Sequence, residues 1–116
     1  MTSDVLVVLS TFGSIDEARA VCRQLVDERL AACANLVPAV ESIYRWQGAV
    51  ETATETMALF KTTADGFAKL EARLRELHSY KVAEVVALPV QRGSEAYLRW
   101  VGENIGAEQA RSTPEV

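Results

Sequence analysis

One long stretch of strand-forming residues, 34–62, constrains this chain more than any other segment. β-Branched and aromatic residues crowd two arms, 35–46 and 50–62, and Gln47-Gly48 supplies the only strong turn signal between them. Arms of this length extend roughly 40 Å at about 3.3 Å per residue, whereas a compact domain of this size is roughly 35 Å across. The segment therefore predicts a β-hairpin that either bends, with Pro38 the natural position, or extends beyond its own core.

The tip of this predicted hairpin carries large apolar side chains at Ile43, Tyr44 and Trp46. An overhanging apolar tip is a liability in a monomer, because unpaired strand edges recruit other strands. Aromatic residues and arginine are enriched in the cores of protein interfaces, and 44–46 reads Tyr-Arg-Trp. We therefore predict an oligomer built by the hairpin, with the three tip residues and Trp100 at the subunit interface.

Length and composition favour a single domain with a substantial core. The chain has 116 residues, of which 49% are apolar, so it can bury a core without disulfides or a structural metal. We place this domain at residues 1–105. Residues 106–116 are mostly small and polar and include a proline, so we expect them to form a flexible C-terminal tail.

Charge, cysteine content and the N-terminal residues indicate the class of protein and its compartment. The formal net charge of −4 argues against a nucleic-acid or membrane-surface binder, since both need a basic surface. Cys22 and Cys33 are too few for a disulfide framework, and reduced, buried thiols are the simpler interpretation. No apolar run reaches the roughly 18 residues of a membrane span, and the N-terminal residues lack a signal-peptide pattern. We expect a cytoplasmic protein.

The hydrophobic pattern predicts elements in the order strand, helix, strand, strand, helix, strand, helix. Their expected ranges are 4–11, 14 to 30–32, 35–46, 50–62, 65–78, 84–89 and 94–105. Ser14 and Glu17 form a capping box at the first helix, with Glu17 reaching back to the cap, and Ser94 caps the last helix. The first six elements match the ferredoxin-like fold, an α+β βαββαβ sandwich, here with a long bent β-hairpin and an extra C-terminal helix.

In this fold both crossover helices cover one face of a four-stranded antiparallel sheet. The other face carries apolar groups from the strands and needs a cover of its own. A dimer or trimer that packs sheet against sheet would supply this cover, in agreement with the length of the hairpin.

The familiar catalytic signatures are missing from the sequence. It has no Gly-rich phosphate loop, no Cys-x-x-Cys, no His-Glu-x-x-His and no serine in a nucleophile elbow. The single histidine, His78, could serve a Ser-His-Asp site, but nothing marks a nucleophile for it. We therefore expect a protein that is not an enzyme.

The segment 78–84, His-Ser-Tyr-Lys-Val-Ala-Glu, is the candidate for metal binding. His78 falls at the end of a predicted helix, where the dipole favours its protonated form, and Glu84 opens the next predicted strand. Across the loop the two side chains could converge. Imidazole and carboxylate suit Cu(II), Zn or Ni, and Cys33 could add a soft ligand. The alternative interpretation is a capping histidine and a surface glutamate.

Lys61 follows the apolar run Met-Ala-Leu-Phe at the inner end of the hairpin. A lysine there must extend its ammonium to solvent, pair with a carboxylate, or face a cleft that holds an anion. In the last case the protein would bind a small anionic ligand. A third hypothesis, an RNA-recognition domain, shares the strand–helix order, but the third strand lacks its aromatic motif. A scaffold without any ligand would show the same pattern.

Several motifs occur together in the order found in one known family. They are Leu-Ala-Ala-Cys-Ala-Asn at 30–35, Ser-Ile-Tyr-Arg-Trp-Gln-Gly at 42–48, Lys-Thr at 61–62, the segment 78–84, and Tyr-Leu-Arg-Trp at 97–100. Together they resemble the CutA family of divalent-cation-tolerance proteins, over about residues 4–105. The resemblance implies a tight homotrimer with exchanged hairpins and intersubunit clefts, similar in architecture to the PII signalling trimers. It also implies a role in tolerance of divalent metals and binding of Cu(II), with no partner other than the chain itself.

The resemblance extends to individual positions. Cys33 matches the family's cysteine in Ala-Ala-Cys. His78 and Glu84 match the first and last residues of its His-Pro-Tyr-x-x-Pro-Glu motif, so these three residues are the implied metal ligands. The implied cleft positions are Tyr44, Trp46, Lys61 and Tyr80, and the alternative function is a PII-like small-ligand sensing or signalling trimer that uses this intersubunit cleft.

The chain departs from the family pattern inside the 78–84 segment. Ser79 and Ala83 stand where the family usually has proline, whose ring stiffens a loop, so we expect a more mobile loop here. Lys81 places a positive charge within the same loop, which works against a cation site.

Overall fold

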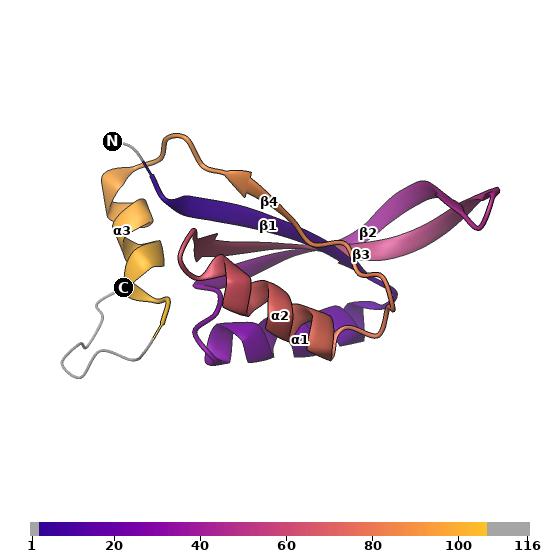
Figure 1. Cartoon of the computed structure of the whole chain (residues 1–116), viewed down its shortest axis with the longest axis horizontal. Coiled ribbons are helices and arrows are strands. Elements are labelled where there is room, and N and C mark those ends of the chain that lie inside the picture. The colour runs from indigo at the N-terminus through magenta and orange to yellow at the C-terminus, as the bar shows by residue number, and fades with distance from the viewer. Residues whose placement is uncertain (1–2, 107–116) are drawn as a thin grey trace.

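The computed structural model describes residues 3–106, which fold into one four-stranded sheet and three helices (Figure 1). In chain order the elements are β1 (Val5–Phe12), α1 (Ile15–Asp27), β2 (Cys33–Trp46), β3 (Ala49–Thr63), α2 (Phe67–Leu77), β4 (Val86–Pro89) and α3 (Glu95–Glu103). The sheet is antiparallel with the order β2-β3-β1-β4. This is the predicted ferredoxin-like fold with an extra C-terminal helix. Of the predicted tail, only Gly106 falls within the described residues.

Helices α1 and α2 cover one face of the sheet, and the core lies between the two layers (Figure 1). Phe12 and Phe60 from the strands meet Leu25, Leu70 and Leu74 from the helices, and all five side chains are fully buried. Apolar residues recur every three or four positions along each helix, which places one stripe of each helix on the sheet. No helix within residues 3–106 has the length and apolar character that crossing a membrane requires.

Ser14 begins α1 as predicted, because its hydroxyl accepts a hydrogen bond from Glu17 N at 3.1 Å. The second half of the predicted capping box is wrong. The Glu17 carboxylate instead accepts hydrogen bonds from Ser79 N at 2.8 Å and from Ser79 Oγ at 3.0 Å. Glu17 thus connects the start of α1 to the loop that follows α2.

Helix α1 ends at Asp27, earlier than the predicted end at 30–32. Arg29 has a φ of 62°, in the left-handed region, and this change of backbone direction stops the helix. The Arg29 guanidinium then donates to Gly106 O at 2.6 Å and to Glu103 O at 2.9 Å. The end of α1 is therefore attached to the end of α3.

Two other boundaries differ from the prediction. Helix α2 starts at Phe67, and Thr63 Oγ1 accepts a hydrogen bond from Gly66 N at 3.1 Å in the turn before it. Strand β4 starts at Val86, because its pairing with β1 covers only four residues of β4. The prediction that Glu84 opens this strand is therefore wrong, and Glu84 lies in the preceding loop.

Strands β2 and β3 form the predicted hairpin, which is both irregular and overhanging. Gln47 and Gly48 form its two-residue turn, with φ values of 50° and 85°. The pairing shifts between Val37 and Val40, so a β-bulge lies at Pro38, the predicted position of the bend. The described chain measures 51 × 27 × 23 Å, and the outer half of the hairpin extends past α1 and α2 (Figure 1).

The face of the sheet opposite α1 and α2 is only partly covered. Helix α3 packs at one end of the sheet, where Leu98 and Val101 meet Val5. Further along, Val86 and Leu88 of the edge strand β4 are exposed. The predicted bare apolar face is thus present in the single chain, apart from the end that α3 covers.

Candidate functional site

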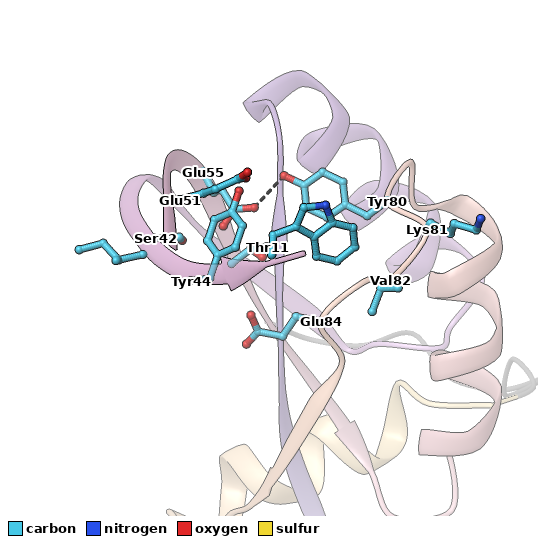
Figure 2. A pocket seen from close by; sticks show the side chains of 11 residues that line it. Thr11, Ser42, Tyr44, Glu51, Glu55, Tyr80, Lys81, Val82 and Glu84 are labelled. Carbon is cyan, nitrogen blue, oxygen red and sulfur yellow. Dashed lines mark hydrogen bonds between the residues drawn. The ribbon is translucent and has the colours of Figure 1, made fainter. Parts of the chain in front are cut away.

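A cavity of about 610 Å³ lies beside the outer half of the hairpin (Figure 2). Its walls come from β2, β3, the end of β1 and the loop between α2 and β4. The lining residues are Thr11, Ser42, Ile43, Tyr44, Trp46, Glu51, Glu55, Tyr80, Lys81, Val82 and Glu84. The cavity therefore combines three aromatic rings with three carboxylates.

The pairing of β2 with β3 determines which hairpin side chains face this cavity. Directly paired residues of an antiparallel sheet point to the same face. Before the bulge, odd-numbered residues of β2 pair with odd-numbered residues of β3. Beyond the bulge, even-numbered residues of β2 pair with odd-numbered residues of β3. One face of the outer hairpin is therefore shared by Ser42, Tyr44, Trp46, Glu51 and Glu55.

Glu55 and Tyr80 form the polar centre of the cavity wall. The Tyr80 hydroxyl donates to Glu55 Oε2 at 2.7 Å (Figure 2). Glu55 is only 8% exposed, yet no lysine, arginine or histidine within residues 3–106 forms an ion pair with it. Burial, and after it the bond to Glu55, raises the pKa of Tyr80, so its hydroxyl stays protonated and remains a donor. The wall thus holds a nearly buried carboxylate without a counter-charge from residues 3–106.

His78 holds the cavity-lining loop in place. Its Nε2 lies 2.7 Å from Thr11 O, and its Nδ1 accepts a hydrogen bond from Tyr80 N at 3.0 Å. A carbonyl only accepts and a backbone amide only donates, so the ring is the neutral tautomer with its proton on Nε2. The ring is fully buried and stacks on Phe12, with centroids 4.4 Å apart. Both nitrogens are engaged within the chain, and a metal at either one would displace a hydrogen bond.

Lys61 and Cys33 lie at the other end of the hairpin. They are direct cross-strand partners, and Lys61 Nζ donates to Asn35 Oδ1 at 2.6 Å and lies 3.8 Å from Cys33 Sγ. Cys33 Sγ also lies 3.5 Å from the Tyr97 hydroxyl of α3. Lys61 lies six positions from Glu55 along β3, or roughly 20 Å of strand. Within one chain, the predicted cleft residues Tyr44, Trp46 and Tyr80 therefore line one cavity, and Lys61 lies outside it. The hydrogen-bond acceptor of Lys61 is the side-chain amide of Asn35, not a carboxylate.

The three predicted metal ligands are not brought together in the single chain. Glu84 lines the cavity, His78 is buried behind Tyr80, and Cys33 lies at the far end of β2. Within residues 3–106 there is no group of three or more His, Cys, Asp or Glu side chains placed to hold a metal ion. The donors within the described part of one chain therefore do not form a metal centre.

The sequence analysis missed Glu51 and Glu55 as cavity residues. The available signal was their spacing: residues four apart on a strand lie on the same face. The two-residue turn at Gln47-Gly48 pairs Tyr44 with Glu51, so spacing and turn together place both glutamates on the face of Tyr44 and Trp46.

Residues 6–104 match the sequence family described as CutA1 divalent ion tolerance protein. The chain belongs to this CutA1 family. A divalent-cation tolerance protein CutA from Thermus thermophilus is 51% identical over 100 residues, which cover 86% of this chain and 97% of the relative. Protein CutA from Homo sapiens is 44% identical over 84 residues, 72% of this chain, but the match spans only 47% of the human protein.

Solved CutA1 structures share the fold. The structure of the divalent cation tolerance protein from Thermus thermophilus superposes with a TM-score of 0.86 at 50% identity, over 88% of this chain and 99% of that one. These findings confirm the resemblance read from the motifs and the ferredoxin-like assignment. The CutA1 family is described by tolerance to divalent ions, not by a reaction.

Two of the departures from the CutA motif, Ser79 and Lys81, can be placed in the structure. Ser79 uses both its amide and its hydroxyl to bind Glu17, which restrains the first residue of the loop in place of a proline ring. Lys81 is exposed, and its ammonium points away from the cavity in Figure 2. The positive charge of Lys81 is therefore not directed at the carboxylates of the cavity wall.

Proposed function

We propose that this CutA1 protein acts in tolerance of and response to divalent metal ions, as a cytoplasmic homotrimer that catalyses no reaction. The family match is the observation that supports a role in divalent-ion tolerance, since the family and the Thermus thermophilus relative are both named for it. Cys22 and Cys33 are free thiols, which fits a reducing compartment.

The exposed hairpin tip supports the proposed assembly. Ile43 is 68% exposed, Trp46 47% and Tyr44 40%, on a segment that extends beyond the core of its own chain. Such a surface is stabilised when another subunit covers it. Trp100 is half-buried on α3 at the opposite end of the molecule, so a closed ring could use both ends of each chain.

We further propose that the assembly binds a divalent metal, copper in the first place, with donors from more than one subunit. This follows from the separation of the predicted ligands within one chain. Glu84 is exposed and the Cys33 thiol is half-buried at the edge strand, so both are available to a neighbour. His78 is the least suitable metal ligand of the three, because metal binding at either ring nitrogen would break a hydrogen bond that holds the loop.

Calorimetric titration of the native assembly with Cu(II) tests this ligand set. Glu84→Gln and Cys33→Ser should each weaken binding by about tenfold or more, which is about 1.4 kcal/mol. Glu71→Gln, on α2 and outside the cavity, is the control with the same charge change. Equal affinity of the wild type and His78→Ala removes His78 from the site, and unchanged affinity in all three variants rejects the metal centre.

A second candidate function is a small-ligand sensing or signalling trimer, and the cavity is the observation that favours it. Its volume of about 610 Å³ lies within the range of small-molecule sites, about 300–1,000 Å³. Stabilisation by a nucleotide, organic acid or amine in a thermal-shift screen, lost in Trp46→Leu, would support this candidate. Stabilisation by divalent metals alone would count against it.

A further inference from the structure

We propose that the outer hairpin, residues 40–55, joins the rest of the domain through a hinge, and that Tyr80 is a positioning residue whose bond to Glu55 fixes the angle of this hinge. The inference rests on the proposed homotrimer, because the fixed angle directs the hairpin of one subunit onto the next. The contacts that support it lie within one chain, and none of them requires the hairpin tip to be uncovered.

The hinge lies where β3 loses one of its two neighbouring strands. Thr56 is the last residue of β3 that pairs with β1, opposite Phe12, and from Glu55 outward β3 pairs with β2 alone. The β-bulge of β2 at 38–39 interrupts this remaining pairing at the same level (Figure 1). A bulge bends its strand, and two-stranded ribbons twist more strongly than wider sheets. The strand pairing alone therefore defines the direction of the outer hairpin only weakly.

Two side-chain hydrogen bonds lie at this hinge. Thr56 Oγ1 donates to Pro38 O at 3.1 Å, which joins the two arms of the hairpin to each other. The Tyr80 hydroxyl donates to Glu55 Oε2 at 2.7 Å, which joins the hairpin to the loop after α2 (Figure 2). A short bond to a charged acceptor is among the stronger hydrogen bonds, and water competes little for Glu55 because this side chain is nearly buried. The bond from Tyr80 therefore holds the hairpin at one angle.

The other end of this connection is itself held in place. Tyr80 N donates to His78 Nδ1 at 3.0 Å. The adjoining Ser79 donates to Glu17 through its amide at 2.8 Å and through its hydroxyl at 3.0 Å. Glu17 belongs to the first turn of α1, whose buried stripe packs on the sheet. The connection thus runs from the helix layer through the loop to the base of the hairpin.

The hinge angle matters because a closed ring tolerates little error. When each subunit contacts the next through a different surface, the ring closes only at one rotation between neighbours, and other rotations give open chains. Trp46 lies six positions beyond Val40 along β2, or roughly 20 Å of strand. A rotation of about 10° at the hinge would therefore move Trp46 by about 3–4 Å, the length of one van der Waals contact. The bond from Tyr80 thus selects the rotation at which three chains close.

Tyr80→Phe, which removes only the hydroxyl, tests this proposal. Tyr97→Phe is the matched control, because it removes a hydroxyl that meets Cys33 at the other end of the hairpin arms. Sedimentation velocity over a dilution series gives the size of the assemblies. A hydrogen bond to a charged acceptor contributes a factor of about ten or more, so the ring should half-dissociate at a protein concentration at least about tenfold higher in Tyr80→Phe than in the wild type. Species larger than three chains should also appear in Tyr80→Phe, whereas Tyr97→Phe should match the wild type.

Residual dipolar couplings of the backbone amides measure the hinge itself, which a general loss of stability would not change. In Tyr80→Phe the couplings of residues 40–54 should shrink, so that their order parameter falls from about 0.85 to below about 0.6. The couplings of β1 and α1 should stay as in the wild type.

A second pair of variants leaves the bond to Glu55 intact. Glu17→Ala frees Ser79 but not Tyr80, so it should produce a smaller change of the same kind. Adding Ser79→Pro should reverse this change, because proline fixes φ at the start of the loop. His78 has φ −77° and ψ 140°, the extended conformation that a residue before proline adopts.

The proposal is overturned if the hairpin couplings of Tyr80→Phe equal those of the wild type, even where the ring dissociates more easily, because Tyr80 would then act on stability alone. It is also overturned if Tyr97→Phe changes the ring and the hairpin couplings as Tyr80→Phe does. If the wild type forms no trimer at any concentration, the proposed assembly is wrong, and the hairpin couplings alone accept or reject the hinge. If Tyr80→Phe does not fold, equal couplings in Glu17→Ala and Glu17→Ala/Ser79→Pro reject the hinge.

Discussion

Replacing His78 by alanine should lower the free energy of unfolding by about 3–5 kcal/mol. The substitution leaves Thr11 O and Tyr80 N without their partner at 2.7 and 3.0 Å. It also removes a fully buried ring that stacks on Phe12. The loop that carries Tyr80 would lose its attachment to the end of β1.

The magnitude follows from two contributions. Each of the two lost hydrogen bonds contributes about 1 kcal/mol, because its partner remains behind in a mostly buried position. Loss of the ring opens a cavity and ends the stacking, for about 1–3 kcal/mol more. His78→Phe keeps the ring and loses only the hydrogen bonds, so it should cost about 2 kcal/mol. The difference between the two variants isolates the packing contribution.

Urea unfolding at matched protein concentration measures the free energy of unfolding of His78→Ala and His78→Phe. An unchanged m-value shows that the same amount of surface becomes exposed on unfolding. Hydrogen exchange at the Tyr80 amide gives a local measurement that does not depend on assembly, and exchange should accelerate in both variants. A loss below about 1 kcal/mol in His78→Ala, or unchanged Tyr80 exchange, would refute the structural role of His78.

Four further predictions concern the tip, the turn and the C-terminal helix. The double variant Tyr44→Ala/Trp46→Ala should dissociate the proposed trimer while circular dichroism shows an intact fold; an unchanged trimer in light scattering removes the tip from the assembly. Gly48→Ala should destabilise the protein by about 1 kcal/mol because Gly48 has a φ of 85°. Gly102 lies inside α3 with open space at its Cβ position, so Gly102→Ala should stabilise the protein by about 0.5–1 kcal/mol. If thermal melting shifts in the same direction for Gly48→Ala and Gly102→Ala, this reasoning is wrong. The hydrogen bond with the neighbouring thiol, followed by burial, raises the pKa of Tyr97 from 10.0 to about 12. The folded chain holds this proton more tightly than the unfolded chain, so the free energy of unfolding falls as the pH rises above about 10. In urea titrations at several pH values, Tyr97→Phe should make this fall shallower. An equally steep fall in the variant would assign the pH dependence to other groups.

Much of the fold is local and could therefore be predicted. The hairpin arms follow from strand-forming composition and the turn from Gln47-Gly48, where both residues have positive φ. The end of α1 could not be found in this way, because Arg29 is an ordinary helix former that adopts a left-handed conformation here. Its guanidinium is bound to carbonyls at the end of α3, more than seventy residues away.

The site depended on contacts between distant segments. Tyr44, Trp46 and Tyr80 were predicted as cleft residues through the family resemblance and do line one cavity. Glu55 alternates with polar neighbours in the sequence, whereas in the fold it is nearly buried and accepts a hydrogen bond from Tyr80, a residue 25 positions away. The predicted metal ligands share no region of the single chain, because residue type indicates chemical compatibility but not proximity.

The β-bulge at 38–39 has a consequence for how this protein can change by insertion or deletion. Two residues of β2 face one residue of β3 there, so removing one of them would restore a regular ladder and leave the cross-strand partners on both sides unchanged. Tyr44 would remain opposite Glu51, on the cavity face. A residue removed between Val40 and Trp46 would instead move the side chains on one side of the deletion to the other face. The bulge is therefore a position where β2 can lose a residue without exchanging the side chains of the cavity wall.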